Sequence, residues 1–173
     1  MIKIAVIFAD GTEEIEALTP VDVLKRAGAV ADVISVSGVQ PTGSHGIKIV
    51  ADKISVDADF SLYDGIVIPG GMPGAINISN DKKVLSAIKD MADSGKLVAS
   101  ICASPAVVLG GNNLLSCDSA TCYPAPDFIK VLGDKYTGEN VTVNNNFITA
   151  NGPKSAMEFS LAICKFLGIN PKF

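Results

Sequence analysis

Strand-like and helix-like segments alternate along the whole chain, and this alternation constrains the fold more than any other feature. Continuous apolar runs bounded by turn residues predict buried strands at 3–8, 31–38, 65–71 and 96–101. Apolar residues at helical spacing predict helices at 13–28, 80–95 and 154–168. The alternation favours a parallel sheet with helices on both faces, and right-handed crossovers then give a doubly wound, flavodoxin-like fold. We expect one α/β domain over residues 1–173.

Several element boundaries carry more specific expectations. Thr19 and Pro20 interrupt the first helix, because Thr19 can cap a new helix that has Pro20 at its first position. Asn80 is the expected cap of the second helix. The alternating segment 47–56 predicts a short hairpin or an edge strand, and 140–152 predicts a hairpin over an Asn-rich turn.

Composition and charge exclude several classes of protein. The chain is 48% hydrophobic and 18% charged, which favours a well-buried core over disorder. Its net charge is −4 and no cluster of Lys or Arg is longer than two, so no nucleic-acid surface is expected. No apolar run reaches the ~18 residues that a membrane span needs, and the N-terminus lacks the pattern of a signal peptide. We therefore expect a soluble, cytoplasmic protein.

No metal or cofactor is expected. The four cysteines form no CxxC pair and read as free thiols in a reducing compartment: Cys102, Cys117, Cys122 and Cys164. The only histidine, His45, is far from all of them in sequence, which argues against zinc. The acids after the first strand would repel a flavin phosphate, and GGMPGA lacks the Gly-Lys-Ser/Thr ending of a nucleotide P-loop.

Cys102 stands at the junction between a strand and a helix-like run in KLVASICASPAVVL. At a helix N-terminus, backbone amides and the helix dipole favour a thiolate, which is the nucleophilic form of cysteine. Because Pro105 has no N–H, the amides of Ala103 and Ser104 are expected to stabilise the anion. A strand-to-helix elbow also exposes the side chain that it carries. The alternative is that Cys102 is a small core residue.

Two other loops at the carboxyl ends of strands carry candidate groups. In ADGTEEIE, Glu13 and Glu14 suit a solvated first helical turn, whereas Glu16 has apolar neighbours and is the acid expected to point inward. A buried carboxyl group beside a thiolate should be protonated. In PGGMPGA, the amide of Gly71 is suited to face a substrate oxygen, unless this glycine only serves a tight turn. His45 is either a base or a surface loop residue, so no ordinary Cys-His triad is evident.

Together the three loops resemble the DJ-1/ThiJ/PfpI superfamily, and its DJ-1-like branch in particular. The resemblance rests on EEIE followed by PVDVLKRAG, then VIPGGMPGA, then ASICASP, and it covers essentially the whole chain. It implies a flavodoxin-like fold and a homodimer. It also implies that Cys102 is the reactive elbow cysteine and Glu16 the protonated glutamate at its sulfur. Gly71 and Ala103 then match the amides around the anion pocket.

Other positions match the family less closely. The resemblance places Arg26 near the dimer surface and His45 in a segment that reaches toward the neighbouring subunit's cysteine. Glyoxalase-active members have a histidine before a proline about twenty residues past the cysteine, but Tyr123 stands there in ATCYPAP. Tyrosine, with a pKa of about 10, is a poor base at neutral pH, although it can donate a hydrogen bond. Ala103 excludes the protease-like members, which have histidine directly after the cysteine.

Three hypotheses of function follow. The first is an enzyme that attacks α-oxoaldehydes such as methylglyoxal, or their early glycation adducts, through a Cys102 hemithioacetal. Glu16 would move the proton, assisted by Tyr123 or by His45 of the partner subunit. The second is a non-enzymatic sensor of oxidative stress, in which peroxide oxidises Cys102 to sulfinic acid. The third is a scaffold with a silent pocket. Cys122, next to Tyr123, is a structural thiol or a resolving thiol, and the other two cysteines are interpreted as structural.

Overall fold

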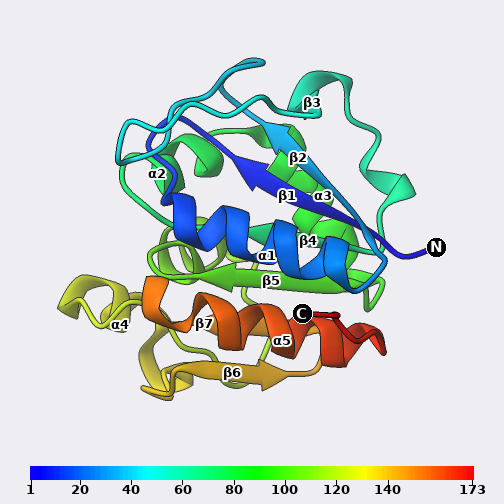
Figure 1. Cartoon of the computed structure of the whole chain (residues 1–173). Coiled ribbons are helices and arrows are strands. Elements are labelled where there is room, and N and C mark those ends of the chain that lie inside the picture. The colour runs from blue at the N-terminus through cyan, green and yellow to red at the C-terminus, as the bar shows by residue number, and fades with distance from the viewer.

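The computed structural model describes all residues, 1–173, and its centre is a seven-stranded sheet (Figure 1). The strands are β1 Lys3–Phe8, β2 Val30–Ser35, β3 Lys53–Ile54, β4 Gly65–Ile68, β5 Leu97–Ile101, β6 Val141–Asn144 and β7 Phe147–Ala150. Their order across the sheet is β3-β2-β1-β4-β5-β7-β6. Every neighbouring pair is parallel except β6 and β7, which form an antiparallel hairpin.

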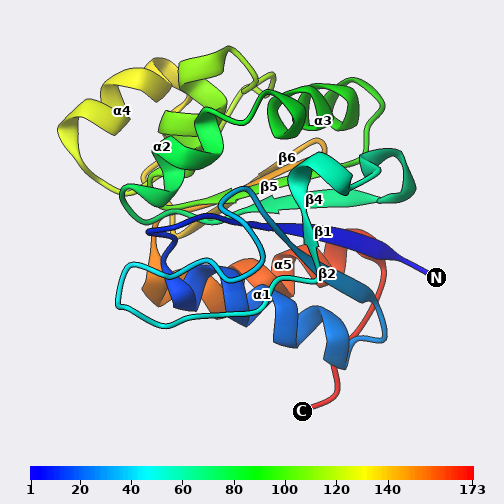
Figure 2. The ribbon, with the colours of Figure 1, turned by 90° about the horizontal axis from the view of Figure 1, so that it is seen from above.

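Helices cover both faces of the sheet, as the view from above shows (Figure 2). Two of them, α1 Glu14–Arg26 and α5 Ala156–Leu167, lie on one face. The other face carries α2 Gly74–Ser79, α3 Lys82–Asp93 and α4 Pro126–Leu132. The predicted flavodoxin-like, doubly wound architecture is therefore confirmed.

Burial on both faces explains why the central strands are continuously apolar. All residues of β4 and β5 are buried, including the small polar Ser100. A strand covered on two sides has no solvent face that could carry polar residues, so the period-2 alternation of a surface sheet is lost. The consequence is two separate apolar cores, one on each side of the sheet.

Two of the boundary predictions are wrong. Helix α1 runs through Pro20 without a break. Proline removes one helical hydrogen bond, but Pro20 is buried together with Val23 and Leu24, and this packing keeps the helix continuous. Asn80 ends α2, while Asp81 caps α3 by accepting hydrogen bonds from the Lys83 and Val84 amides at 3.0 Å each.

The other connections agree with the sequence pattern. The segment 47–56 contains the short edge strand β3, which pairs with β2, and 140–152 contains the β6–β7 hairpin. The run after Cys102 is shorter than an ordinary helix: a π-helical turn at Pro105–Leu109 is followed by a 3₁₀ turn at Gly110–Asn112. None of the helices has the length and apolar character needed to cross a bilayer.

Candidate active site

Cys102 lies on a strained elbow directly after β5. Its φ of 65° is in the left-handed region, which non-glycine residues rarely adopt. Hydrogen bonds hold the elbow on both sides, because the Cys102 amide donates to the Ala150 carbonyl at 2.9 Å and the Tyr123 amide donates to the Cys102 carbonyl at 2.8 Å. The buried hydroxyl of Ser104 donates to the Pro69 carbonyl at 2.6 Å. The sulfur is thus presented by a rigid backbone, and Cys102 is the one cysteine that is not fully buried.

Glu16 is completely buried beside this thiol. Its Oε2 accepts a 2.8 Å hydrogen bond from the Gly70 amide. Its Oε1 has no hydrogen-bond partner, and the carboxyl group and the Cys102 thiol are near enough to shift each other's pKa. Gly70 lies between the two groups, since a Cβ there would be 2.7 Å from Cys102 Cβ and 2.8 Å from Glu16 Oε2. Only a residue without a side chain allows the carboxyl group to reach the sulfur.

Two backbone amides lie close to the sulfur, and they are the two that the family resemblance implies rather than the two expected from the helix N-terminus alone. The amides of Ala103 and Gly71 are close enough to the sulfur to lower the pKa of the Cys102 thiol. Ala103 was expected in this role, whereas the contribution expected from Ser104 comes from Gly71, on the loop after β4. Gly71 has a φ of 85°, and a side chain there would collide with the Glu13 backbone. Amides from two different strand ends therefore form the anion hollow.

The pKa values of Glu16 and Cys102 do not favour the thiolate that was expected from the position of Cys102. Burial raises the pKa of Glu16 to about 7, against the lowering effect of hydrogen bonds with Cys102 and Gly70. Burial also raises the pKa of the Cys102 thiol, and the negative charge of Glu16 raises it further, although the amides of Ala103 and Gly71 lower it. Two anions cannot share this dry site cheaply. A thiolate at Cys102 therefore requires Glu16 to be protonated, and the amides alone do not keep the thiol ionised.

Glu14 is not the solvated residue that its position suggested. It is only 5% exposed, and its carboxylate binds the loop that carries His45. Glu14 Oε2 lies 2.9 Å from His45 Nδ1, and Glu14 Oε1 accepts a 2.8 Å hydrogen bond from the His45 amide. His45 is mostly exposed, as a loop residue would be, and its hydrogen-bond partners in the chain are Glu14 and Ser44 rather than the thiol. The sequence gives no local signal for this contact, because 31 positions separate the two residues.

The same region contains the one group of three side chains whose potential metal-binding atoms lie close together. Ligand atoms of Glu13, Glu14 and His45 lie within 4.8 Å of one another. His45 Nδ1 is 3.3 Å from Glu13 Oε2, slightly farther than from Glu14.

Tyr123 lies next to the elbow and forms one wall of a polar cavity of about 550 Å³. The side chain is 47% exposed, and its ring lies close to Gly152. Polar residues line most of the cavity, among them Asn140, Asn151 and Lys154. The Tyr123 amide donates to the Cys102 carbonyl, so one wall of the cavity is joined to the elbow, but Cys102 does not itself line the cavity.

The remaining cysteines are poorly placed for redox chemistry. Cys122 is fully buried, and Cys117 and Cys164 are 3% and 1% exposed. Burial raises the pKa of all three thiols, which disfavours the reactive thiolate. This burial supports a structural role for Cys122 rather than a resolving one.

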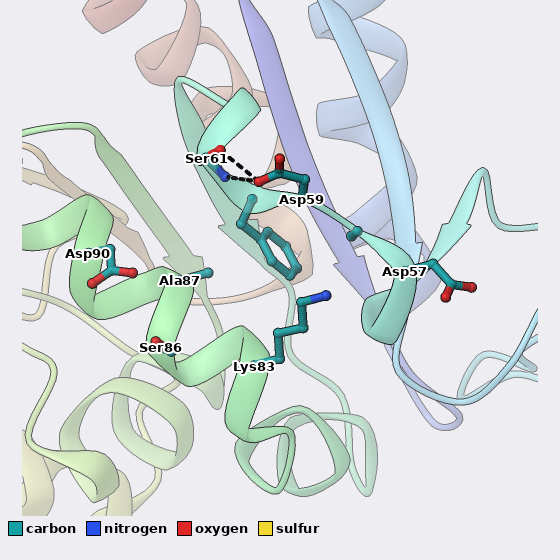
Figure 3. Close-up of a pocket in the computed structure, with 9 residues that line it drawn as sticks. Asp57, Asp59, Ser61, Lys83, Ser86, Ala87 and Asp90 are labelled. Carbon is teal, nitrogen blue, oxygen red and sulfur yellow. Dashed lines mark hydrogen bonds between the residues drawn. The ribbon is translucent and has the colours of Figure 1, made fainter.

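A second hollow is separate from these groups (Figure 3). It lies between α3 and the segment before β4, with Asp57, Asp59, Lys83 and Asp90 around it. The Asp59 carboxylate accepts hydrogen bonds from Ser61, and the Lys83 ammonium donates to the Val56 carbonyl. None of the candidate site residues lines it, so it is not part of the thiol site.

A flavodoxin-like sheet with a half-buried thiol on a strained elbow, beside a buried carboxyl group, defines an α/β protein with a nucleophile-elbow cysteine. The chain belongs to the DJ-1/PfpI family, whose sequence model matches residues 2–166. It is 39% identical over 168 residues to protein DJ-1 homolog B of Arabidopsis thaliana, covering 96% of this chain and 38% of that protein. It is 35% identical to the Parkinson disease protein 7 homolog of Danio rerio, covering 94% and 87% of the two chains.

Solved structures agree with this assignment. An oxidized DJ-1 of Toxoplasma gondii superposes with a TM-score of 0.92 at 39% identity, covering 96% of this chain and 91% of that one. DJ-1beta of Drosophila melanogaster superposes with a TM-score of 0.88 at 31% identity, covering 96% and 90%. The chain spans less than half the length of the two Arabidopsis relatives, but most of the fish protein.

Proposed function

We propose that this chain acts on α-oxoaldehydes such as methylglyoxal, or on their early glycation adducts, through a covalent intermediate at Cys102. The observation that carries this proposal is the pairing of one thiol with one buried carboxyl group under two backbone amides. The thiol is a nucleophile for an aldehyde carbon, the amides are donors for the oxygen that becomes negative, and the carboxyl group can exchange a proton.

The steps balance without an added oxidant or metal ion. The Cys102 sulfur forms a bond to the aldehyde carbon, the carbonyl electron pair moves to oxygen, and that oxygen takes a proton to give a hemithioacetal. The proton on the same carbon is then removed and one is returned to the neighbouring ketone carbon, while the hydroxyl proton of the first carbon is lost and the ketone oxygen gains one, which leaves a thioester of lactate. Water cleaves the thioester, releases lactate and restores the thiol. Glu16 is suited to the first proton transfer because its pKa of about 7 allows both protonation states near neutral pH.

A relative supports the direction of this proposal. A Caenorhabditis elegans protein that is 33% identical over 160 residues is named a glutathione-independent glyoxalase. Tyr123 stands where the sequence resemblance implies a histidine, so in this chain the second proton transfer needs another group. The polar cavity beside Tyr123 would hold the part of the substrate that does not react.

The alternative is a non-enzymatic sensor in which peroxide oxidises Cys102. Two equivalents of peroxide would each transfer an oxygen to the sulfur and leave as water, giving a sulfinic acid that a protonated Glu16 can hydrogen-bond. The similar DJ-1 structure of Toxoplasma gondii is described as oxidized, which supports this alternative.

Two measurements on the purified protein separate these functions. Methylglyoxal is added and lactate is followed for the wild type and for Cys102→Ser. Lactate that the variant does not form supports the enzyme. No lactate, together with a gain of two oxygen atoms on Cys102 alone at low peroxide, supports the sensor. A protein that does neither is a scaffold, and the proposal is then wrong.

We also infer a homodimer in the cytoplasm. Helix α1 exposes Ile15 at 54% and Leu18 at 36%, and burial of such side chains against a second copy would be favourable. The four free cysteines suit a reducing compartment. Sedimentation at micromolar concentration tests the dimer, and a monomer would contradict it.

A further inference from the structure

Two acidic side chains at the start of α1 meet the only histidine of the chain in a cluster that does not include Cys102 or Glu16. His45 Nδ1 lies 2.9 Å from Glu14 Oε2 and 3.3 Å from Glu13 Oε2. Ligand atoms held about 2.0–2.2 Å from a tetrahedral Zn²⁺ are separated from one another by about 3.3–3.6 Å. The observed spacing is therefore close to that of ligands around one metal ion.

Backbone amides fix both carboxyl groups so that one oxygen of each faces the imidazole. Glu13 Oε1 accepts the Ile15 amide at 3.2 Å, and Glu14 Oε1 accepts the His45 amide at 2.8 Å. In both glutamates the other oxygen, Oε2, is the one that faces the ring. Hydrogen bonds that hold the outer atoms of the ligands are a regular feature of metal sites. The three donor atoms are thus set in place by the fold rather than by an ion.

The two segments that carry these residues are already joined through their backbones. The Gly11 amide donates to the Thr42 carbonyl, and the Ser44 amide donates to the Thr12 carbonyl, both at 2.8 Å. The Ser44 hydroxyl lies within 3.4 Å of the Oε2 atoms of both glutamates, so it adds a fourth polar atom to the cluster. Because these segments are ordered in the protein alone, binding of an ion would not have to order them.

The charges of the cluster are not balanced by other side chains. The Glu13 and Glu14 side chains are only 13% and 6% exposed. Neither forms an ion pair with a lysine or an arginine, and the one cationic group that can face them is a protonated His45. One imidazolium supplies a single positive charge against two carboxylates. Buried charges are normally paired or bound to a metal ion, and a divalent cation would balance both carboxylates.

The kinds of donor atom distinguish among metal ions. An imidazole nitrogen with carboxylate oxygens suits Zn²⁺, whereas Mg²⁺ and Ca²⁺ prefer shells made of oxygen alone. The sequence argument against zinc considered only cysteine as a partner of His45. We propose that Glu13, Glu14 and His45 form a Zn²⁺ site that ties the start of α1 to the connection between β2 and β3. The site is independent of the reaction proposed for Cys102.

The experiment uses untagged protein that carries Cys102→Ser, because a thiol is itself a zinc ligand. Titration calorimetry should show that this protein binds one equivalent of Zn²⁺. We expect His45→Ala and Glu14→Gln, each added to it, to weaken binding at least about tenfold. Asp22→Asn removes a charge at an exposed site on the same helix and should leave the affinity unchanged. Zn²⁺ at about a hundred times Kd should raise Tm by about 5 °C, but not in the His45→Ala protein.

A second readout observes the histidine itself. Because His45 is the only histidine, its ring protons give a single set of proton NMR signals, which one equivalent of Zn²⁺ should shift and Mg²⁺ should not. The absence of Zn²⁺ binding in the Cys102→Ser protein would overturn the proposal. Equal affinity in the His45→Ala protein, or histidine signals that Zn²⁺ leaves in place, would overturn it as well.

The His45→Ala variant keeps the test decisive if Glu14→Gln does not fold, since the His45 side chain is 69% exposed and little packing is lost. Neither readout measures lactate. A protein that binds Zn²⁺ at His45 but forms no lactate as wild type would refute the proposed function and leave the metal site standing. The reverse result would refute the metal site alone.

Discussion

The amide of Gly70 donates a 2.8 Å hydrogen bond to Glu16 Oε2, and this contact holds the buried carboxyl group beside the Cys102 thiol. The glycine follows β4 and the glutamate is in α1, so the contact joins the loop after β4 to the first turn of the helix. The reactivity of the Cys102 thiol therefore depends on the Glu16 carboxyl group, which the backbone of the loop after β4 holds in place.

The first prediction concerns alkylation of Cys102 by iodoacetamide as a function of pH. Glu16→Gln removes the charge and keeps a hydrogen-bond donor, whereas Glu16→Leu removes both. We expect the Gln variant to have a lower thiol pKa than the wild type, because the carboxylate raises it. The Leu variant should react about tenfold more slowly than the Gln variant near pH 8, since a hydrogen bond to a charged group contributes about 1.5–3 kcal/mol. Equal rates in the two variants would contradict the contact between residue 16 and the sulfur.

The second prediction concerns stability against pH. The pKa of Glu16 rises from 4.5 to about 7 on folding, so the folded state holds a proton that the unfolded state has lost between these values. The contribution of Glu16 to the free energy of unfolding is fully present below pH 4.5 and is lost as the pH rises through 7. The loss between pH 5 and 8 should be about 3 kcal/mol. Urea unfolding of the wild type should show it, and a Glu16→Gln variant that loses just as much would contradict the assignment.

The third prediction tests the space at Gly70. An alanine methyl would lie 2.7 Å from Cys102 Cβ and 2.8 Å from Glu16 Oε2, so one of them must move. Gly70→Ala should destabilise the protein by about 1–3 kcal/mol and make alkylation resemble that of Glu16→Leu. Gly111→Ala is the control, because its Cβ would only touch the Ala106 carbonyl at 3.5 Å. Wild-type alkylation in Gly70→Ala would count against the proposed crowding.

The fourth prediction concerns the elbow. Ser104→Ala removes the 2.6 Å hydrogen bond to the Pro69 carbonyl and leaves that buried acceptor unpaired. We expect a loss of about 1–3 kcal/mol and a changed alkylation rate. Asp81→Ala, which removes the cap of α3 and the 2.6 Å acceptor of the buried Ser55 hydroxyl, should also cost about 1–3 kcal/mol but leave the rate unchanged. Parallel changes in both variants would mean that the rate follows global stability rather than elbow geometry.

The fold could be predicted because its strands are buried on both faces and its helices are amphipathic. The burial of Glu16 was also predicted, but the argument from its neighbours was incomplete: Ile15 is 54% exposed and Leu18 is 36% exposed. Helical geometry places Glu16 on the face of α1 that also buries Pro20 and Val23. Adjacent apolar residues did not indicate that face.

The role of Glu14 could not be predicted from local pattern. An acid in a first helical turn is ordinarily solvated, and the loop that buries this one comes 31 positions later. Gly71, in contrast, was named from its glycine-rich loop and from the family resemblance, although its amide approaches the sulfur from a different strand end than that of Ala103. Contacts between loops depend on the order of strands in the sheet, which alternation alone leaves open.

The position of β4 between β1 and β5 has a consequence for how such a site can vary. The segments that carry Glu16, Gly70 and Cys102 follow β1, β4 and β5, which are adjacent strands of the sheet. The strand register, for example Val67 opposite Ala99, therefore fixes how far along the sheet each segment begins. Loop residues can be exchanged one at a time. Deletion of a single residue within β4 would instead turn each of its side chains to the opposite face of the sheet. It would also move Gly70 away from Glu16 and from Cys102 at the same time.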